Sequence, residues 1–194
     1  MANEGVDRRR RRFLVAATSV VGGAGVVAVA APFLASWQPS ARAQAAGAPV
    51  EVNVSQIEPG QRISVAWRGR PVWVVRRTPE MIELLPQIRD RLRDPDSEIT
   101  TQQPAYAQNE HRSVRPEILV LIGICTHLGC SPAFRPEIGA PEIGSDWPGR
   151  WLCACHGSRF DMAGRVYRNV PAALNLQVPP YFFVSDDLIV VGED

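Results

Sequence analysis

The apolar pattern divides the chain into two parts of different character. An uncharged stretch runs from Phe13 to Trp37, and its 25 residues are rich in Ala, Gly and Val. As a helix it would be roughly 37 Å long, enough to cross a hydrocarbon core of about 30 Å. After Pro49 the pattern changes to short segments rich in Val, Ile and Trp, separated by Gly and Pro. The sequence therefore predicts a single transmembrane helix over residues 13–37 and a mainly-β head over residues 50–194.

A basic segment precedes the apolar stretch. Five arginines run from Arg8 to Arg12, and residues 10–14 read R-R-x-F-L, which resembles a twin-arginine export signal. Positive charge before a membrane span predicts a cytoplasmic N-terminus. We therefore expect residues 1–12 in the cytoplasm, a single pass through a bacterial inner membrane, and a periplasmic head.

A cleaved signal peptide is the alternative to a retained anchor. Ala41-Arg42-Ala43 has the A-x-A form of a cleavage site. The apolar core of a signal peptide is usually about 7 to 15 residues long, so the longer stretch favours retention. Residues 38–49 read QPSARAQAAGAP, with one charge and no apolar periodicity. We interpret them as a hinge linker, although their alanines are also compatible with a helix.

The head pattern predicts short strands and one helix. Strand signals fall at 50–54, 62–67, 71–77, 118–124, 151–152, 166–167, 176–178, 182–185 and 188–191. Apolar residues at helical spacing predict a helix over 79–92, with Thr78 as N-cap and Pro86 kinking or ending it. Residues 94–112 read as a polar loop, in which His111 is expected to be solvated. The expected head is an antiparallel sandwich or small barrel with one helix.

Composition narrows the classes of function. A hydrophobic content of 45% and a charged content of 21% are typical of a globular domain. The net charge of +1 argues against a general nucleic-acid binder. The charge is unevenly placed: residues 1–42 hold six Arg against two acids (+4), and the remainder holds 15 Arg against 18 acids (−3). This split agrees with a cytoplasmic N-terminus.

The four cysteines and two of the three histidines form two short boxes. Residues 125–130 read CTHLGC, and residues 153–158 read CACHGS. Thiolate together with imidazole indicates a transition metal. A Cys2His2 zinc site is one alternative, but the spacing is not that of a zinc finger, and six candidate ligands exceed four. Structural disulfides are another alternative in an oxidising compartment, but they leave both histidines unexplained.

Both boxes resemble those of the Rieske iron–sulfur proteins. The match is to C-T-H-L-G-C and C-x-C-H-G-S, and the resemblance extends through anchor and head. The full chain is similar to the Rieske subunits of ubiquinol–cytochrome c reductases, the cytochrome bc complexes of bacterial respiration. This implies a Rieske-type head whose cluster-binding subdomain covers about residues 119–176.

The resemblance implies a role for each chemical group of the boxes. Four residues, two from each box, would ligate one [2Fe–2S] cluster: Cys125, His127, Cys153 and His156. Cys130 and Cys155 would form a disulfide between the two loops. The Ser158 hydroxyl would hydrogen-bond a cluster sulfur. Phe160 stands where many relatives have a Tyr that donates a further hydrogen bond, so we expect a lower reduction potential than in those relatives.

Two further segments are interpreted through the same resemblance. Residues 171–176 resemble the family's proline-rich third loop over the cluster, although its second proline is replaced by Ala173. Residues 131–152 are rich in Pro and Gly and are expected to form an enlarged loop for contact with a partner.

The implied function is electron transfer in a proton-translocating quinol–cytochrome c oxidoreductase. Neutral imidazole in place of two thiolates raises the potential of such a cluster into roughly −150 to +300 mV. The cluster would accept one electron from quinol while His127 or His156 takes up a proton, and would reduce a c-type cytochrome. Cytochrome b, quinol, the membrane and a dimeric complex are the implied partners, and nucleic acid is not.

Other functions for a Rieske-like chain are less consistent with the sequence. The small Rieske subunit of a periplasmic oxidase such as arsenite oxidase shares the export signal and the extra cysteines, but the long anchor and the C-H-G-S form favour the quinol enzyme. A soluble Rieske ferredoxin that serves an oxygenase lacks the counterparts of Cys130 and Cys155.

Overall fold

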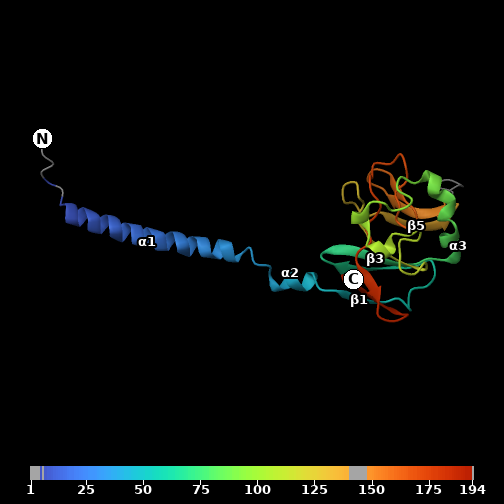
Figure 1. Cartoon of the computed structure of the whole chain (residues 1–194), viewed down its shortest axis with the longest axis horizontal. Coiled ribbons are helices and arrows are strands. Elements are labelled where there is room, and N and C mark those ends of the chain that lie inside the picture. The colour runs from blue at the N-terminus through green and yellow to red at the C-terminus, as the bar shows by residue number, and fades with distance from the viewer. Residues whose placement is uncertain (1–4, 6, 140–147, 194) are drawn as a thin grey trace. The chain divides into compact units, whose positions relative to one another are not determined.

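The computed structural model describes residues 5, 7–139 and 148–193, and the chain divides into two units, residues 1–45 and 46–194 (Figure 1). In the first unit, α1 (Arg8–Ala35) is 28 residues long and contains the predicted apolar stretch up to residue 35. Asp7 caps its N-terminus, since its carboxylate accepts hydrogen bonds from the N–H groups of Arg9 (2.8 Å) and Arg10 (3.3 Å).

The side chains of α1 are exposed along its length, and no residue of the helix is buried. Val20 is 72% exposed and Phe33 is 68% exposed. By length and composition this helix can cross a membrane, a criterion that a signal sequence near the N-terminus also meets. The residues predicted as a hinge linker contain a short helix, α2 (Ala41–Ala46), so this segment is partly helical.

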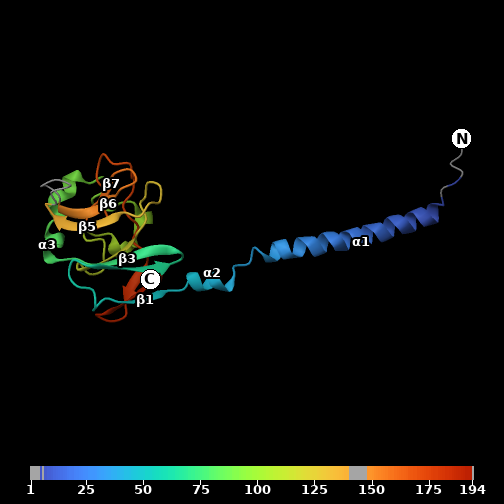
Figure 2. The same cartoon turned by 180° about the vertical axis from the view of Figure 1, so that it is seen from behind.

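Three antiparallel sheets of three strands each form the head. The first has the order β1-β9-β8: β1 (Val50–Asn53), β9 (Leu188–Val191) and β8 (Tyr181–Phe183). The second has the order β2-β3-β4: β2 (Arg62–Trp67), β3 (Arg70–Arg76) and β4 (Ile118–Ile122). The third has the order β5-β6-β7: β5 (Ala133–Ile138), β6 (Pro148–Cys153) and β7 (Ser158–Phe160). In Figures 1 and 2, β3 lies between β1 on one side and β5 on the other.

A stacked pair of tryptophans joins the second and third sheets. Trp73 of β3 and Trp151 of β6 lie with ring centroids 4.4 Å apart and planes inclined by 7°, and both are buried. Gly123 follows β4 directly, and a Cβ at this position would lie 2.2 Å from the Trp73 ring. Only glycine therefore leaves room for the Trp73 ring at this position. The contact packs the residues just before the first box against the core.

The polar segment 94–112 is packed against the head rather than solvated throughout. Arg112 is fully buried, and its guanidinium donates to the carbonyl of Ala163 (3.1 Å) and to Oε1 of Gln103 (3.0 Å). Burial lowers the pKa of Arg112 to about 10. His111 is half-buried and therefore only partly solvated, and its backbone carbonyl accepts a hydrogen bond from Arg77.

The predicted strands and helix are largely confirmed, with specific corrections. The predicted helix 79–92 stops early, because α3 (Pro79–Glu83) is followed by a 3-10 helix, η1 (Pro86–Arg91), that begins at Pro86. Thr78 caps α3 as predicted. Residues 176–178 are not a strand, since the Leu176 and Val178 N–H groups bond Gly164 and Gln102 instead of a sheet partner.

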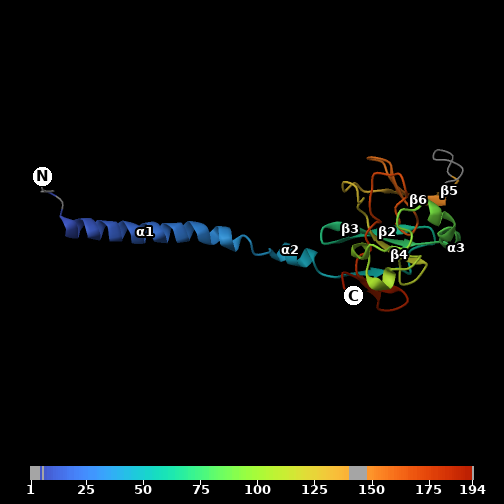
Figure 3. The ribbon, with the colours of Figure 1, turned by 45° about the horizontal axis from the view of Figure 1, so that its top comes forward.

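The remaining corrections concern the third sheet and the head architecture. Residues 166–167 form only isolated bridges. The sequence pattern missed β7, and the expected enlarged loop 131–152 contains β5 and β6, with residues 140–147 outside the described part. Among the described residues, the sheets do not close into a barrel (Figure 3).

Candidate metal centre

The first box is a tight turn at the end of β4. The Cys125 N–H donates to the carbonyl of Cys130 (2.7 Å), and the Gly129 N–H donates to the carbonyl of Cys125 (3.1 Å). Gly129 has φ +85°, a conformation that glycine adopts without strain. The turn therefore returns Cys130 to Cys125 and leaves Leu128, 71% exposed, at its apex.

The second box joins β6 to β7. Cys153 ends β6 and is paired with Ser158, the first residue of β7. The Gly157 N–H donates to the carbonyl of Cys153 (2.9 Å), and Gly157 has φ +75°. Since β4 and β6 contribute to the same core, the two boxes meet at one end of the head; we call residues 125–130 and 153–158 the tip.

Two cysteines face inward at the tip. Cys125 and Cys153 are free thiols, 3% and 2% exposed. Burial raises the pKa of the Cys125 thiol, the backbone N–H of His127 lowers it, and the adjacent Cys153 thiol raises it again. Two neighbouring buried thiols are suited to hold a metal, which takes them as thiolates.

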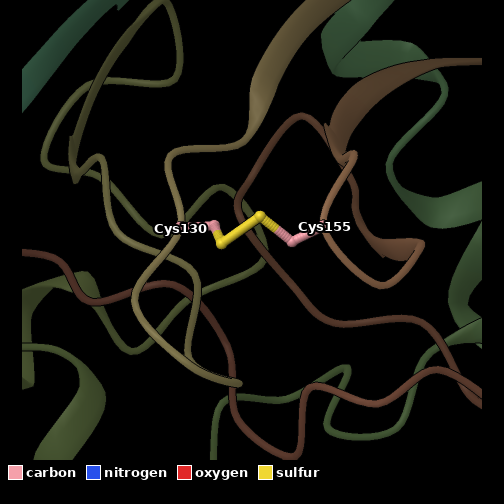
Figure 4. The surroundings of a disulfide bond; sticks show 2 residues. All are labelled: Cys130 and Cys155. Atoms are coloured by element: carbon pink, nitrogen blue, oxygen red, sulfur yellow. A yellow bond between two sulfur atoms is a disulfide. The ribbon is translucent and has the colours of Figure 1, made fainter.

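A disulfide closes the tip. Cys130 and Cys155 are bonded, each from one of the two loops, as Figure 4 shows. The pairing implied by the family resemblance is therefore confirmed. The sulfur atoms of Cys130, Cys153 and Cys155 all lie within 4.8 Å of one another, so the cross-link lies against an inward-facing thiol.

The two histidines lie together nearer the surface. The ring centroids of His127 and His156 are 4.8 Å apart and their planes are inclined by 89°. His127 is half-buried and His156 is exposed. The Nδ1 atom of His127 is buried, with no hydrogen-bond partner among the described residues. A buried nitrogen is costly without a partner, and a metal would supply one. Two adjacent thiols and two adjacent imidazoles thus fit the [2Fe–2S] cluster that the sequence implies.

Ser158 lies where its hydroxyl can act on a ligand sulfur. It is fully buried, its oxygen accepts a hydrogen bond from the Ala172 N–H (3.0 Å), and its hydroxyl lowers the pKa of the neighbouring Cys125 thiol. Phe160 is also fully buried and pairs with Trp151 across β6 and β7.

Sequence reasoning assigned no role to Thr126, which connects the first box to the segment 171–176. Its hydroxyl donates to the carbonyl of Leu174 (2.6 Å). A threonine between two ligands offers no signal by itself, because its partner is 48 residues away in the chain.

Comparisons with known proteins agree with this geometry. Residues 48–180 match the model of the Rieske [2Fe-2S] domain, and residues 1–40 match the model described as "Ubiquitinol-cytochrome C reductase Fe-S subunit TAT signal". The ubiquinol-cytochrome c reductase iron-sulfur subunit of Allochromatium vinosum is 56% identical over 194 residues, which cover 100% of this chain and 93% of the relative.

A more distant relative carries the same name. The iron-sulfur subunit of Rhodospirillum rubrum is 41% identical over 97% of this chain and 94% of its own length. A solved chain titled "Hyperthermophilic respiratory Complex III" is 24% identical, with a TM-score of 0.48 over 91% of this chain and 98% of that chain. By the domain match and the full-length identity, the chain belongs to the Rieske [2Fe–2S] family and, within it, to the ubiquinol–cytochrome c reductase iron–sulfur subunits.

Proposed function

We propose that this chain is the electron-transfer subunit of a membrane-bound quinol–cytochrome c oxidoreductase. The observation that carries the proposal is the tip, where two buried thiols, two histidines near the surface and a disulfide come together in a chain related over its whole length to such subunits. A bound [2Fe–2S] cluster supplies one-electron transfer at a potential within reach of quinol.

The proposed ligands divide by exposure. Cys125 and Cys153 hold the cluster from the buried side, and His127 and His156 hold it from the side nearer solvent. The neutral imidazoles bind through one ring nitrogen, which leaves the other free to exchange a hydrogen bond. His156 is exposed, and once its free ring nitrogen has lost its own proton it can accept a hydrogen bond from a quinol hydroxyl and then take up the quinol proton. This assigns quinol binding to the histidine side of the tip.

The proposed partners and placement follow from the two units. Residues 1–12 lie in the cytoplasm, residues 13–37 anchor the chain in the inner membrane, and residues 50–194 form the periplasmic head with its cluster-binding part at about 119–176. The arginines at the start of α1 and the match to an export-signal model support this orientation. Cytochrome b and a c-type cytochrome of the same complex, arranged as a dimer, are the proposed partners.

One experiment tests this function directly. The tagged full-length chain is purified from membranes, reduced, and examined by visible absorption and electron paramagnetic resonance (EPR). We expect the spectrum of a [2Fe–2S] cluster, together with cytochromes b and c in the same preparation. A zinc-containing protein without an EPR signal, or a mature protein that begins at Gln44, would contradict the proposed cofactor or anchor, respectively.

Residues 38–49 are proposed as a hinge that lets the head move between donor and acceptor. Prolines introduced at Gly47 and Ala48, beyond the end of α2, should stiffen the segment and slow turnover of the complex, while the cluster spectrum stays the same. Serines at the same two positions are the matched control. Turnover that is equal in the proline and serine variants would contradict the hinge.

A further inference from the structure

The segment 171–176 contacts both boxes of the tip. The Ala172 N–H donates to the Ser158 hydroxyl oxygen (3.0 Å), and the Leu174 carbonyl accepts from the Thr126 hydroxyl (2.6 Å). The position of this segment therefore sets the direction of two hydroxyl groups that adjoin the proposed ligands.

Asn175 attaches this segment to the rest of the head. Its side chain is fully buried, and both ends of its amide are used. Oδ1 accepts a hydrogen bond from the Val166 N–H (2.8 Å). Nδ2 donates to the Asp94 carbonyl (3.1 Å), and the Ser97 hydroxyl oxygen lies 3.4 Å from it. Three separate segments thus meet at one amide, which fixes its orientation.

The turn at residues 94–97, to which the Asn175 amide is hydrogen-bonded, is stabilised by further hydrogen bonds. The Asp94 carboxylate accepts a hydrogen bond from the Glu98 N–H (2.9 Å), which closes the turn. The Gln103 amide donates to the Ser97 carbonyl (2.8 Å), and Ser97 is fully buried. Residues 94–97 therefore offer Asn175 a rigid anchor outside the tip.

We propose that Asn175 is a positioning residue for the cluster ligands. It fixes the segment 171–176 against the turn 94–97, and through that segment it sets the hydrogen bonds at Thr126 and Ser158. The Ser158 oxygen is held by the Ala172 N–H, and its hydroxyl lies beside the Cys125 thiol, whose pKa it lowers. The inference rests on the proposed ligand set.

Loss of this anchor has a consequence beyond stability. Hydrogen bonds to the sulfur atoms of an iron–sulfur cluster stabilise its reduced state and raise its potential. If the segment 171–176 shifts, the Ser158 hydroxyl loses the position, fixed by the Ala172 N–H, from which it can hydrogen-bond the sulfur of a proposed ligand. The midpoint potential then falls, although no ligand has been changed.

The test compares Asn175→Ala with Asn109→Ala in the full-length chain. Asn109 is the matched control because its amide donates to the carbonyls of Tyr106 (3.0 Å) and Ser113 (2.9 Å) and accepts from the His111 N–H (3.0 Å), all outside the tip. Both variants should lower thermal stability. Only Asn175→Ala should shift the midpoint potential downward in a redox titration and change the EPR g values of the reduced protein.

The outcomes separate the inference from the proposed function. An unchanged potential and spectrum in a folded Asn175→Ala protein would overturn the positioning role, while the wild-type spectrum would still support the cluster. If Asn175→Ala does not fold, Ser97→Ala removes only the 3.4 Å contact and should give a smaller downward shift. A potential equal to that of the wild type in Ser97→Ala would then overturn the role.

Discussion

The inner and outer sides of the tip place opposite demands on the chain. The inner side holds Cys125, Cys153 and Ser158, which are at most 3% exposed and take part in the core. The outer side holds His156 and Leu128, which are exposed. This difference fits the proposal that the inner side retains the cluster and that the outer side meets quinol and partner proteins.

The largest expected effect is at the inner side. Cys125→Ser should abolish the cluster, because a buried hydroxyl replaces a thiolate ligand that the iron requires. The measurement is the iron content and EPR signal of the purified protein, with the exposed Ser64→Ala as control. A variant that keeps the wild-type amount of cluster would remove Cys125 from the ligand set.

Removal of the disulfide should cost less than removal of a ligand. The bond closes a loop with a sequence separation of 25 residues, for which loop entropy gives about 3 kcal/mol of stability. The double variant Cys130→Ala and Cys155→Ala should therefore unfold at a lower temperature and release its cluster sooner on heating. Calorimetry of the oxidised proteins checks this, and equal transitions would show that packing alone holds the two loops together.

A change on the outer side should leave the head intact. Leu128→Ala removes a side chain that is 71% exposed, so the free energy of unfolding should change by less than about 0.5 kcal/mol. Burial of this leucine against a partner would contribute about 1.5 kcal/mol or more. Quinol oxidation by the assembled complex should therefore slow while the cluster spectrum is retained. If Leu128→Ala clearly destabilised the isolated subunit, the outer side of the tip would contribute to folding, as the inner side does, and the proposed distinction would be wrong.

The smallest effect is expected at Phe160, which lies fully buried behind the tip. Phe160→Tyr adds one hydroxyl, and a hydrogen bond from it toward the cluster would raise the midpoint potential. A redox titration measures the shift, with circular dichroism to confirm that the fold tolerates the added oxygen. An unchanged or lower potential would contradict the role that the family resemblance implies for this position.

Local sequence signals predicted much of the fold because their causes are local. The start of α3 follows from Thr78 and Pro79, and its early end follows from Pro86. The strand 188–191 was predicted with the bounds that β9 shows. By contrast, β7 is only three residues long and contains no apolar run that would predict a strand. Its formation therefore depends on pairing with β6.

The candidate site divides in the same way between sequence and structure. The family that the two boxes resemble implies the proposed ligands and the Cys130–Cys155 pair, and the structure confirms this pair as a disulfide. No sequence pattern indicates that the Thr126 hydroxyl donates a hydrogen bond to the Leu174 carbonyl or that the Asn175 amide donates one to the Asp94 carbonyl. These partners are 48 and 81 residues apart in the chain.

The sequence by itself determined an apolar N-terminal helix, a mainly-β head and the residue types of a Rieske centre, because hydropathy, turn chemistry and ligand spacing are properties of short segments. Only the tertiary structure decided that Arg112 in a polar segment is buried and that residues 176–178 form no strand. It also decided that the cysteines Cys125 and Cys153 of the tip are buried while His156 and Leu128 are exposed. Burial and long-range hydrogen bonding depend on which distant segments pack together, and that is settled only when the whole head folds.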